Sequence, residues 1–360
     1  MESLNNIDNF LEMIDRPAFF VQDGIITKLN QIAKNRYIKV GTEIARMLPP
    51  ESPEYNSFTE GCLHLTVFIG RVPCRTTVIR YPEGDIFLLE RDFDRIQLQT
   101  MALSAQQLRV PLSNIMTLTD ELLPQLMKSE DETTRYQATH INQGLFQLLR
   151  LIANMADAER YFNMIEPPTE VVNLPGLFNS IMEKAAVTLE EAGMKLVYTP
   201  YDKRKFGFAD REKLERAVLN MLSNAAKFSP KDSVIEASVN IEGDRLRFSV
   251  RDHGDGIAPQ VWGTLYARYQ REPAIEDSRF GMGLGMTLIH TAAATHGGTV
   301  LVDQPEDGGT RVTMTIRVSK APANILRTST MSISSYTGGW DTSLVEFSDI
   351  LPTDSFEHNA

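Results

Sequence analysis

The chain has 360 residues, of which 42% are hydrophobic and 23% are charged, an ordinary composition for a globular protein. That length exceeds one compact core and predicts two or three domains. There are 36 Lys and Arg against 47 Asp and Glu, so the formal net charge is −11. This charge argues against nonspecific binding to nucleic acid or to an anionic membrane.

The sequence predicts a cytosolic protein. Its two cysteines, Cys62 and Cys74, are too few for a disulfide scaffold and lack the spacing of metal ligands. The start, MESLNNIDNF, lacks the basic and then apolar pattern of a signal peptide. No apolar run approaches the ~18 residues that span a bilayer, so no membrane insertion is expected.

Residues 1–91 predict a small α+β module. Strand-like pieces such as AFFVQDG, LHLTVFIG, CRTTVIR and DIFLLERD flank a short helical stretch near QIAKNRYI, with turns at 23–24 and 82–84. This order resembles a PAS-type sensor domain. The sequence contains no flavin or haem signature that would name a ligand.

Residues 92–165 carry a helical seam in place of strands. Mostly apolar residues, with Thr119 among them, recur at alternating spacings of four and three, at 101, 105, 108, 112, 115, 119, 122 and 126. A polar break at KSEDETT separates them from a second seam at 141, 145, 148, 152, 155, 159 and 162. The pattern predicts an antiparallel helix hairpin that pairs with a second copy as a four-helix bundle, and hence a homodimer.

Residues 166–318 alternate between helical and strand patterns. A helix is expected over 211–228, followed by a hairpin that turns at 242–244 and by two closing strands, TVLVDQ and TRVTMTIRV. The whole chain is therefore expected to be an α+β multidomain protein. Residues 319–360, rich in Ser and Thr, are expected to form a mobile tail, although the amphipathic piece 342–351 is a candidate for docking on the preceding domain.

Three clusters in this third segment predict nucleotide chemistry. Asn220, Asn224 and Lys227 share one face of the 211–228 helix, where amides can ligate Mg²⁺ and a lysine can meet phosphate. Asp252 ends a strand, where a carboxylate can accept the exocyclic amine of adenine. A run of glycines, G-M-G-L-G-M at 281–286, opens a helix whose first amides can face phosphate.

Taken in order, these clusters closely resemble the GHKL-type ATP-binding domain of sensor histidine kinases. The N box matches N-M-L-S-N-A-A-K-F, the G1 box D-H-G-D-G, the F box L-Y-A-R-Y-Q-R at 265–271 and the G2 box G-M-G-L-G-M, with H-G-G-T-V and G-G-T closing the pattern. The resemblance implies an α/β sandwich of the Bergerat type that binds ATP and Mg²⁺. It implies Asn224 as the Mg²⁺ ligand, Asp252 as the adenine reader, and contributions from Asn220, Lys227, Gly254, Gly256, Gly281, Gly283, Leu284, Gly285 and Thr310.

The same resemblance explains the run S-A-Q-Q-L-R-V-P-L at 104–112. The family's phosphoacceptor box has the form F-S-H-E-L-R-T-P-L, so Gln106 stands at the histidine position and Gln107 at the acid/base position. A carboxamide nitrogen is delocalised and non-basic, which makes it unable to accept a phosphoryl group. Val110 likewise replaces the residue that holds water for phosphatase activity. His140 is no substitute, because it lies about 24 Å from position 106 along the hairpin.

Three functions remain open on the sequence. The first is a degenerate kinase that binds ATP, forms no phosphohistidine and regulates a response regulator or another signalling protein. The second is an active kinase that phosphorylates a partner or a non-standard residue such as Ser104. The third is a scaffold that no longer binds ATP.

Overall fold

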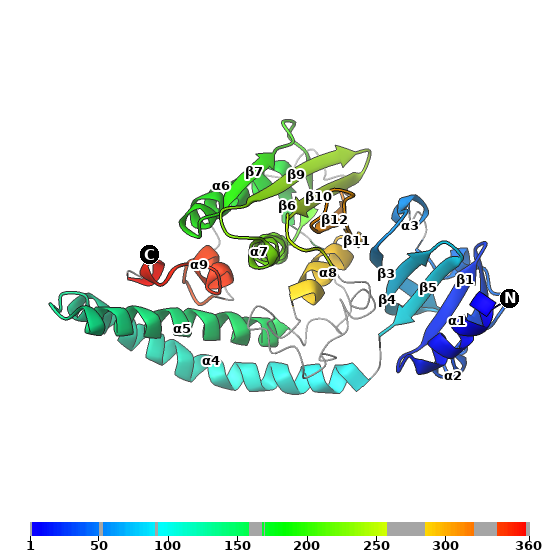
Figure 1. The fold of residues 1–360 in the computed structure, drawn as a ribbon, viewed down its shortest axis with the longest axis horizontal. Coiled ribbons are helices and arrows are strands. Elements are labelled where there is room, and N and C mark those ends of the chain that lie inside the picture. The colour runs from blue at the N-terminus through cyan, green and yellow to red at the C-terminus, as the bar shows by residue number, and fades with distance from the viewer. Residues whose placement is uncertain are drawn as a thin grey trace.

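The computed structural model describes residues 2–49, 53–90, 93–157, 168, 170–257, 285–319 and 337–357. The protein is a mixed α+β structure with three parts (Figure 1). A small sheet module contains the N-terminus, a second sheet covered by helices lies beside it, and a long helix hairpin runs below that second part in this view.

The N-terminal module is a five-stranded antiparallel sheet in the order β2-β1-β5-β4-β3. The strands are β1 Ala18–Gln22, β2 Ile25–Leu29, β3 Cys62–Ile69, β4 Val72–Tyr81 and β5 Gly84–Leu89, and the helices are α1 Glu2–Met13, α2 Gln31–Lys34 and α3 Pro53–Ser57. Asp23 and Gly24 both have positive φ, 50° and 76°, and together they make the tight turn between β1 and β2. Phe19 and Phe87 stack at 4.9 Å across the core of the module.

The predicted hairpin consists of α4 Phe93–Leu126 and α5 Glu132–Asp157. Helix α4 continues through Pro111 and Pro124, each of which removes one backbone donor from the helix ladder. Asp131, within the polar break, caps the start of α5, because its carboxylate accepts the amides of Thr133 and Thr134 in the first turn of that helix.

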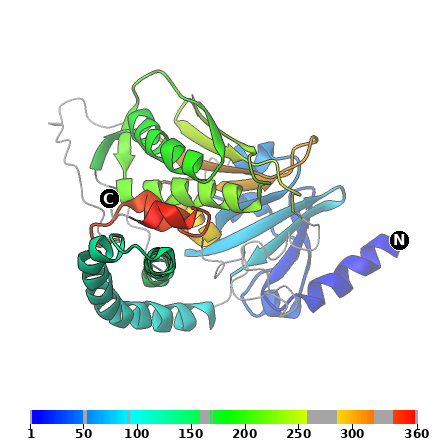
Figure 2. The same cartoon turned by 60° about the vertical axis from the view of Figure 1, so that its left-hand side comes forward.

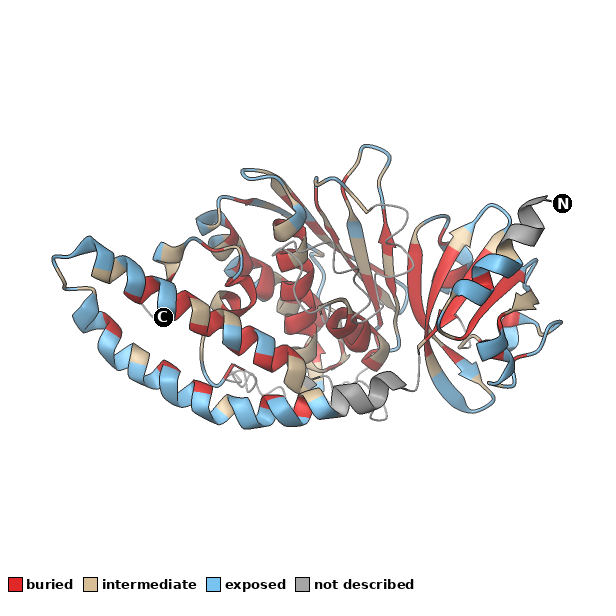
Figure 3. Cartoon of the chain, turned by 60° about the horizontal axis from the view of Figure 1, so that its bottom comes forward, coloured by how far each residue is buried: buried red, intermediate tan, exposed pale blue. Residues whose placement is uncertain are grey.

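The α4 seam divides into two stripes within a single chain. Ala105 and Leu112 are buried, together with Met116 and Leu123, whereas Leu122 remains 52% exposed. The other exposed apolar residues of the hairpin include Leu108, Ile115, Leu118, Ile141 and Leu148. Figure 3 shows this alternation of buried and exposed stripes along α4.

The second sheet has the order β11-β12-β10-β9-β7. Its strands are β7 Lys195–Thr199, β9 Val234–Glu242, β10 Arg245–Arg251, β11 Val300–Asp303 and β12 Arg311–Arg317, and its helices are α6 Leu174–Glu191, α7 Arg211–Phe228 and α8 Gly285–Thr295. Strands β6 Glu170–Asn173 and β8 Phe206–Ala209 form a separate pair. Buried and partly exposed residues alternate strictly along β10, so one face of the sheet meets the helices.

The two sheets join into one sheet of ten strands. Edge strand β3 of the N-terminal module pairs antiparallel with edge strand β11, with Leu63 opposite Leu301 and His64 opposite Val300. The ring of His64 meets that of His290 on α8 edge-on, at 3.6 Å between centroids. Sequence patterns did not predict this join, because they identify strands but not which edges pair.

The C-terminal segment docks on the rest of the chain. Helix α9 Thr342–Phe347 and a 3-10 turn, Thr353–Phe356, lie against α5, α6 and α7 (Figure 2). Phe347 and Phe356 are fully buried, and the ring of Phe356 lies 5.3 Å from that of Phe146 on α5. For residues 337–357 this differs from the predicted mobile tail, because the apolar face of 342–351 has a surface to pack against.

Among the described helices, none is long and apolar enough to cross a membrane.

Candidate functional site

Helix α7 occupies the centre of the site, and its N-terminal end is held by two hydrogen bonds that involve Asp210. Asp210 caps its start by accepting the amide of Lys213 at 3.0 Å. The amide of Asp210 in turn donates to Nε2 of His296 at 3.0 Å, so the end of α8 is tied to the start of α7. Burial lowers the pKa of His296, which is consistent with a neutral ring that accepts at Nε2 and donates from Nδ1 to the Ala292 carbonyl. His296 is therefore a structural residue.

The three residues predicted on one face of α7 lie together there. Asn220 is almost wholly buried, at 1% exposure, whereas Asn224 is half-buried. A Cβ added to Gly285, the first residue of α8, would lie 3.0 Å from Oδ1 of Asn220 and 3.9 Å from Oδ1 of Asn224. The start of α8 therefore directly faces the asparagine pair.

Asp252 lies at the end of β10, beside the C-terminal end of α7. Its Oδ1 accepts two backbone amides, from Gly254 at 2.9 Å and from Thr310 at 3.0 Å. Burial raises the pKa of this carboxyl above its ordinary value, against the lowering effect of those two amides. Asp252 and Thr310 are thus held together, and Oδ2 takes no part in either bond.

The two glycines that follow Asp252 are favoured for different reasons, Gly254 by a close backbone contact and Gly256 by its positive φ. A Cβ on Gly254 would lie 2.1 Å from the carbonyl oxygen of Phe228, and one on Gly256 would lie 2.4 Å from the Gln304 side chain. Gly256 also has φ +75°, which favours glycine. These contacts bring the loop 252–256 against the end of α7.

Part of the predicted site lies outside the described residues. This applies to Gly281, Gly283 and Leu284 of the G2 box and to the whole run 265–271. Of the glycine run, Gly285 is described, and it stands beside the asparagines.

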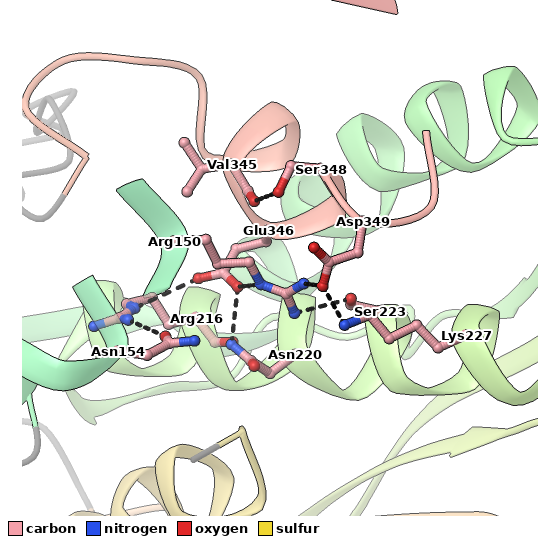
Figure 4. Close-up of polar contacts among 10 residues, drawn as sticks. All are labelled: Arg150, Asn154, Arg216, Asn220, Ser223, Lys227, Val345, Glu346, Ser348 and Asp349. Atoms are coloured by element: carbon pink, nitrogen blue, oxygen red, sulfur yellow. Dashed lines mark hydrogen bonds and ion pairs between the residues drawn. The ribbon is translucent and has the colours of Figure 1, made fainter. Parts of the chain in front are cut away.

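An ionic cluster that sequence reasoning missed lies on the same helix (Figure 4). Arg150 of α5 contacts Glu346 of α9 at 3.2 Å and Asp349 at 2.6 Å, and its Nη2 donates to Oγ of Ser223 at 3.0 Å. Arg216 of α7 lies 3.6 Å from the other oxygen of Glu346. The cluster therefore ties α5, α7 and α9 to one another.

Two of the predicted phosphate-side residues belong to this cluster. The Nδ2 of Asn220 donates to Glu346 at 3.1 Å and to the carbonyl of Arg216 at 2.9 Å. Lys227 forms an ion pair with Asp349. Burial, and then the neighbouring Arg150 guanidinium, lower the pKa of Lys227, while Asp349 opposes the shift. The only sequence signal for this cluster was the amphipathic piece 342–351.

The donor set suits a cation carried by a nucleotide better than a resident metal. Within the described part of the chain there is no group of three or more His, Cys, Asp and Glu residues able to hold a metal ion. The half-buried Asn224 offers one amide oxygen beside the start of α8. Mg²⁺ typically takes one or two protein ligands and completes its shell with phosphate oxygens and water, and this site fits that requirement.

Helix α4 presents the glutamine pair to solvent. Gln106 and Gln107 are both exposed, and the nearby Val110 is exposed as well. The Ser104 hydroxyl donates to the Thr100 carbonyl at 2.9 Å. His140 is exposed on α5, 5.4 Å from the ring of Tyr136.

Comparison with known proteins identifies the ATPase part of the chain. Residues 209–320 match the family model described as "Histidine kinase-, DNA gyrase B-, and HSP90-like ATPase". The histidine protein kinase DivJ of Caulobacter vibrioides is 28% identical over 62% of this chain and 37% of its own length. The sensor-like histidine kinase SenX3 of Mycobacterium tuberculosis is 27% identical over 57% of this chain and 50% of its own.

The chain thus spans half or less of the length of these relatives. Among solved structures, full-length ShkA in complex with AMPPNP is similar over 62% of this chain and 47% of that one. Its TM-score is 0.49 and its sequence identity 23%.

Proposed function

Because the chain belongs to the sensor histidine kinase family, we propose that it is a degenerate member that binds ATP with Mg²⁺. In this proposal it forms no phosphohistidine at the usual position. Nucleotide and the state of the N-terminal module together set the shape of a dimer that a signalling partner recognises. The observation that carries this proposal is the convergence of Asn220, Asn224, Asp252 and Gly285 around α7, beside a helix that presents Gln106 where the family has its acceptor.

The geometry around α7 supports the nucleotide site. Asp252 has one oxygen held by the amides of Gly254 and Thr310, and Oδ2, which takes no part in those two bonds, would accept the amine of adenine. Asn224 would supply an amide oxygen for Mg²⁺ beside the start of α8, where the first backbone amides of a helix favour an anion such as phosphate. Bound Mg²⁺ would neutralise part of the triphosphate charge.

The residues on α4 support the loss of autophosphorylation. Phosphoryl transfer to nitrogen needs a lone pair that is free to attack, and the amide nitrogen of Gln106 has none. Gln107 carries no carboxylate to take or orient a proton. Ser104 is a weak alternative acceptor, because its hydroxyl is committed to the Thr100 carbonyl. The remaining alternative is an active kinase whose acceptor is on a partner protein.

The rest of the chain supports the signalling role. The strand order β2-β1-β5-β4-β3 and the short helices before β3 support a PAS-like sensor module. The exposed apolar stripe of α4 and α5, which includes Leu108, Ile115, Leu122 and Ile141, supports a homodimer through residues 92–165. We further propose a cytoplasmic location and a response regulator or another signalling protein as the partner.

Incorporation of label from γ-labelled ATP tests this proposal. The wild type should bind ATP–Mg²⁺ and take up no acid-labile phosphate, whereas Gln106→His with Gln107→Glu should take it up. Gln125→His is the matched control, because it adds a histidine to an exposed site of the same helix about 28 Å away.

Acid-labile phosphate on the wild type would refute the degenerate assignment. Acid-stable phosphate on a mixed-in partner would favour the active-kinase alternative. Loss of nucleotide binding altogether would favour the scaffold.

A further inference from the structure

The C-terminal segment 337–357 meets α7 at the residues proposed to face the phosphates. Helix α7 has α8 on one side and α9 on the other, and Asn220 touches both, with Oδ1 toward Gly285 and Nδ2 bonded to Glu346. Lys227, about two helical turns further along, is paired with Asp349. Glu346 and Asp349 of the segment thus contact groups of the proposed nucleotide site.

The ionic cluster has more positive than negative groups. Arg150, Arg216 and Lys227 are at least nine-tenths buried as side chains, and they face the two carboxylates of Glu346 and Asp349. Buried cations are costly without compensating anions. In the docked state the segment's carboxylates supply that compensation, and without them the three cations would form a strong site for an anion of higher charge.

A triphosphate has the charge and the geometry for this role. Arginine and lysine both bind phosphate oxygens, and arginine does so through two parallel donors. Arg150 already presents Nη1 to Asp349 and Nη2 to Ser223 along the edge of α7 that also holds Lys227. A γ-phosphate beside Asn224 and Asn220 would therefore meet the same cations that now hold the segment.

We propose that the carboxylates of Glu346 and Asp349 act as an internal competitor for the phosphate groups of ATP. Docking of the segment and full engagement of the triphosphate then exclude each other. This inference rests on the proposed nucleotide site and adds Arg150 of α5 to its phosphate-binding groups.

The rest of the segment is built for a defined docked state. Gln143 of α5 donates to the carbonyls of Ser348 and Leu351 at 3.3 and 3.1 Å, and Asn142 donates to that of Phe356 at 2.8 Å. The buried side chains Phe347 and Phe356 hold the segment by apolar contact. Release would free the face of α5 that carries these amides, so nucleotide binding would also change the surface of the hairpin.

The test compares Asp349→Asn with Asp354→Asn in the full chain. Asp349 is 34% exposed as a side chain, so its neutralisation is tolerable, and it removes the anion shared by Arg150 and Lys227. Asp354 lies in the same segment, is exposed and, within the described residues, forms no ion pair with the cluster's cations. Affinity is measured with a fluorescent ATP analogue and Mg²⁺, and segment release by hydrogen exchange of residues 342–357.

We expect Asp349→Asn to tighten nucleotide binding about tenfold, the effect of losing one competing charge-assisted contact. Asp354→Asn should stay within about twofold of the wild type. Saturating nucleotide should speed hydrogen exchange of 342–357 in the wild type.

Equal affinities for the two variants, or slower exchange with nucleotide, would overturn the competition while leaving the nucleotide site intact. If the wild type, Asp349→Asn and a chain ending at residue 336 all fail to bind nucleotide, the proposed nucleotide site fails, and the competition fails with it.

Discussion

Replacing Arg150 by Met should release the C-terminal segment without unfolding the protein. The substitution removes the contacts of Arg150 to Glu346 and Asp349 and its hydrogen bond to Ser223. Breaking a buried ion pair from one side costs about 3–5 kcal/mol. Glu346 keeps Arg216 at 3.6 Å, so we expect the lower end of this range, about 3 kcal/mol in the free energy of docking, or roughly a hundredfold in the docking equilibrium.

Hydrogen exchange resolved by peptide measures this cost locally, because the segment is a small unit whose opening precedes global unfolding. Amides of residues 342–357 should exchange about a hundredfold faster in Arg150→Met, while those of β9 and β10 stay unchanged. Arg135→Met is the control on the same helix, since Arg135 only pairs with the exposed Glu132 at 3.9 Å and should change exchange little. Unchanged exchange of 342–357 in Arg150→Met would refute the assigned role of the cluster.

Three further predictions concern the ATPase domain and the hairpin. Asp252→Asn keeps the acceptor for both backbone amides, and burial raises the pKa of Asp252. Because the pKa of Asp252 is raised in the folded state, the protonated carboxyl favours folding at low pH and this advantage is lost as the group ionises at higher pH. The variant should therefore have a higher Tm than the wild type at pH 7 and no advantage below about pH 4. An equal shift of the Tm at both pH values would contradict this. Leu122→Glu, on the exposed stripe, should halve the mass in sedimentation while Glu121→Gln does not, and an unchanged dimer would exclude that face. Gly298→Ala would place a Cβ 1.8 Å from a backbone carbonyl and should lower the Tm by several degrees, whereas Gly144→Ala, in a helix with open space around it, should raise it slightly; the reverse order would contradict the packing described.

The helices and strands of the ATPase domain were predictable because local signals agreed there. The 211–228 helix was expected with its observed bounds, since Asp210 offers a cap and Pro230 closes the far end. The β9–β10 hairpin was predictable because apolar and polar residues alternate on both sides of a turn at Gly243. The resemblance to the family's N and G1 boxes also assigned Asn220, Asn224 and Asp252 to one nucleotide site.

The joins between parts were not predictable in the same way. The pairing of β3 with β11 depends on which two edges meet after folding, and the residues of β3 look like those of any buried strand. The α4 seam was expected as one stripe, yet its members divide between packing within the chain and exposure. The spacing of apolar residues alone does not show which neighbouring element packs against each side of a helix.

The C-terminal segment differs most from the prediction of a mobile tail, although the sequence also marks 342–351 as a docking candidate. Its Ser- and Thr-rich composition predicted mobility over 319–360, while residues 337–357 pack on three helices. Glu346 and Asp349 are ordinary acidic residues in the sequence, and their importance arises from three cations on two other helices. Such a cluster becomes visible only when separate parts of the chain are brought together.

Calorimetric titration of the full chain with ATP and Mg²⁺ tests the proposed function most directly. We expect saturable one-site binding that requires Mg²⁺ and is lost in Asn224→Ala, with the fold intact by circular dichroism. Absence of binding by both the wild type and Asp349→Asn, or equal binding by Asn224→Ala, would contradict it.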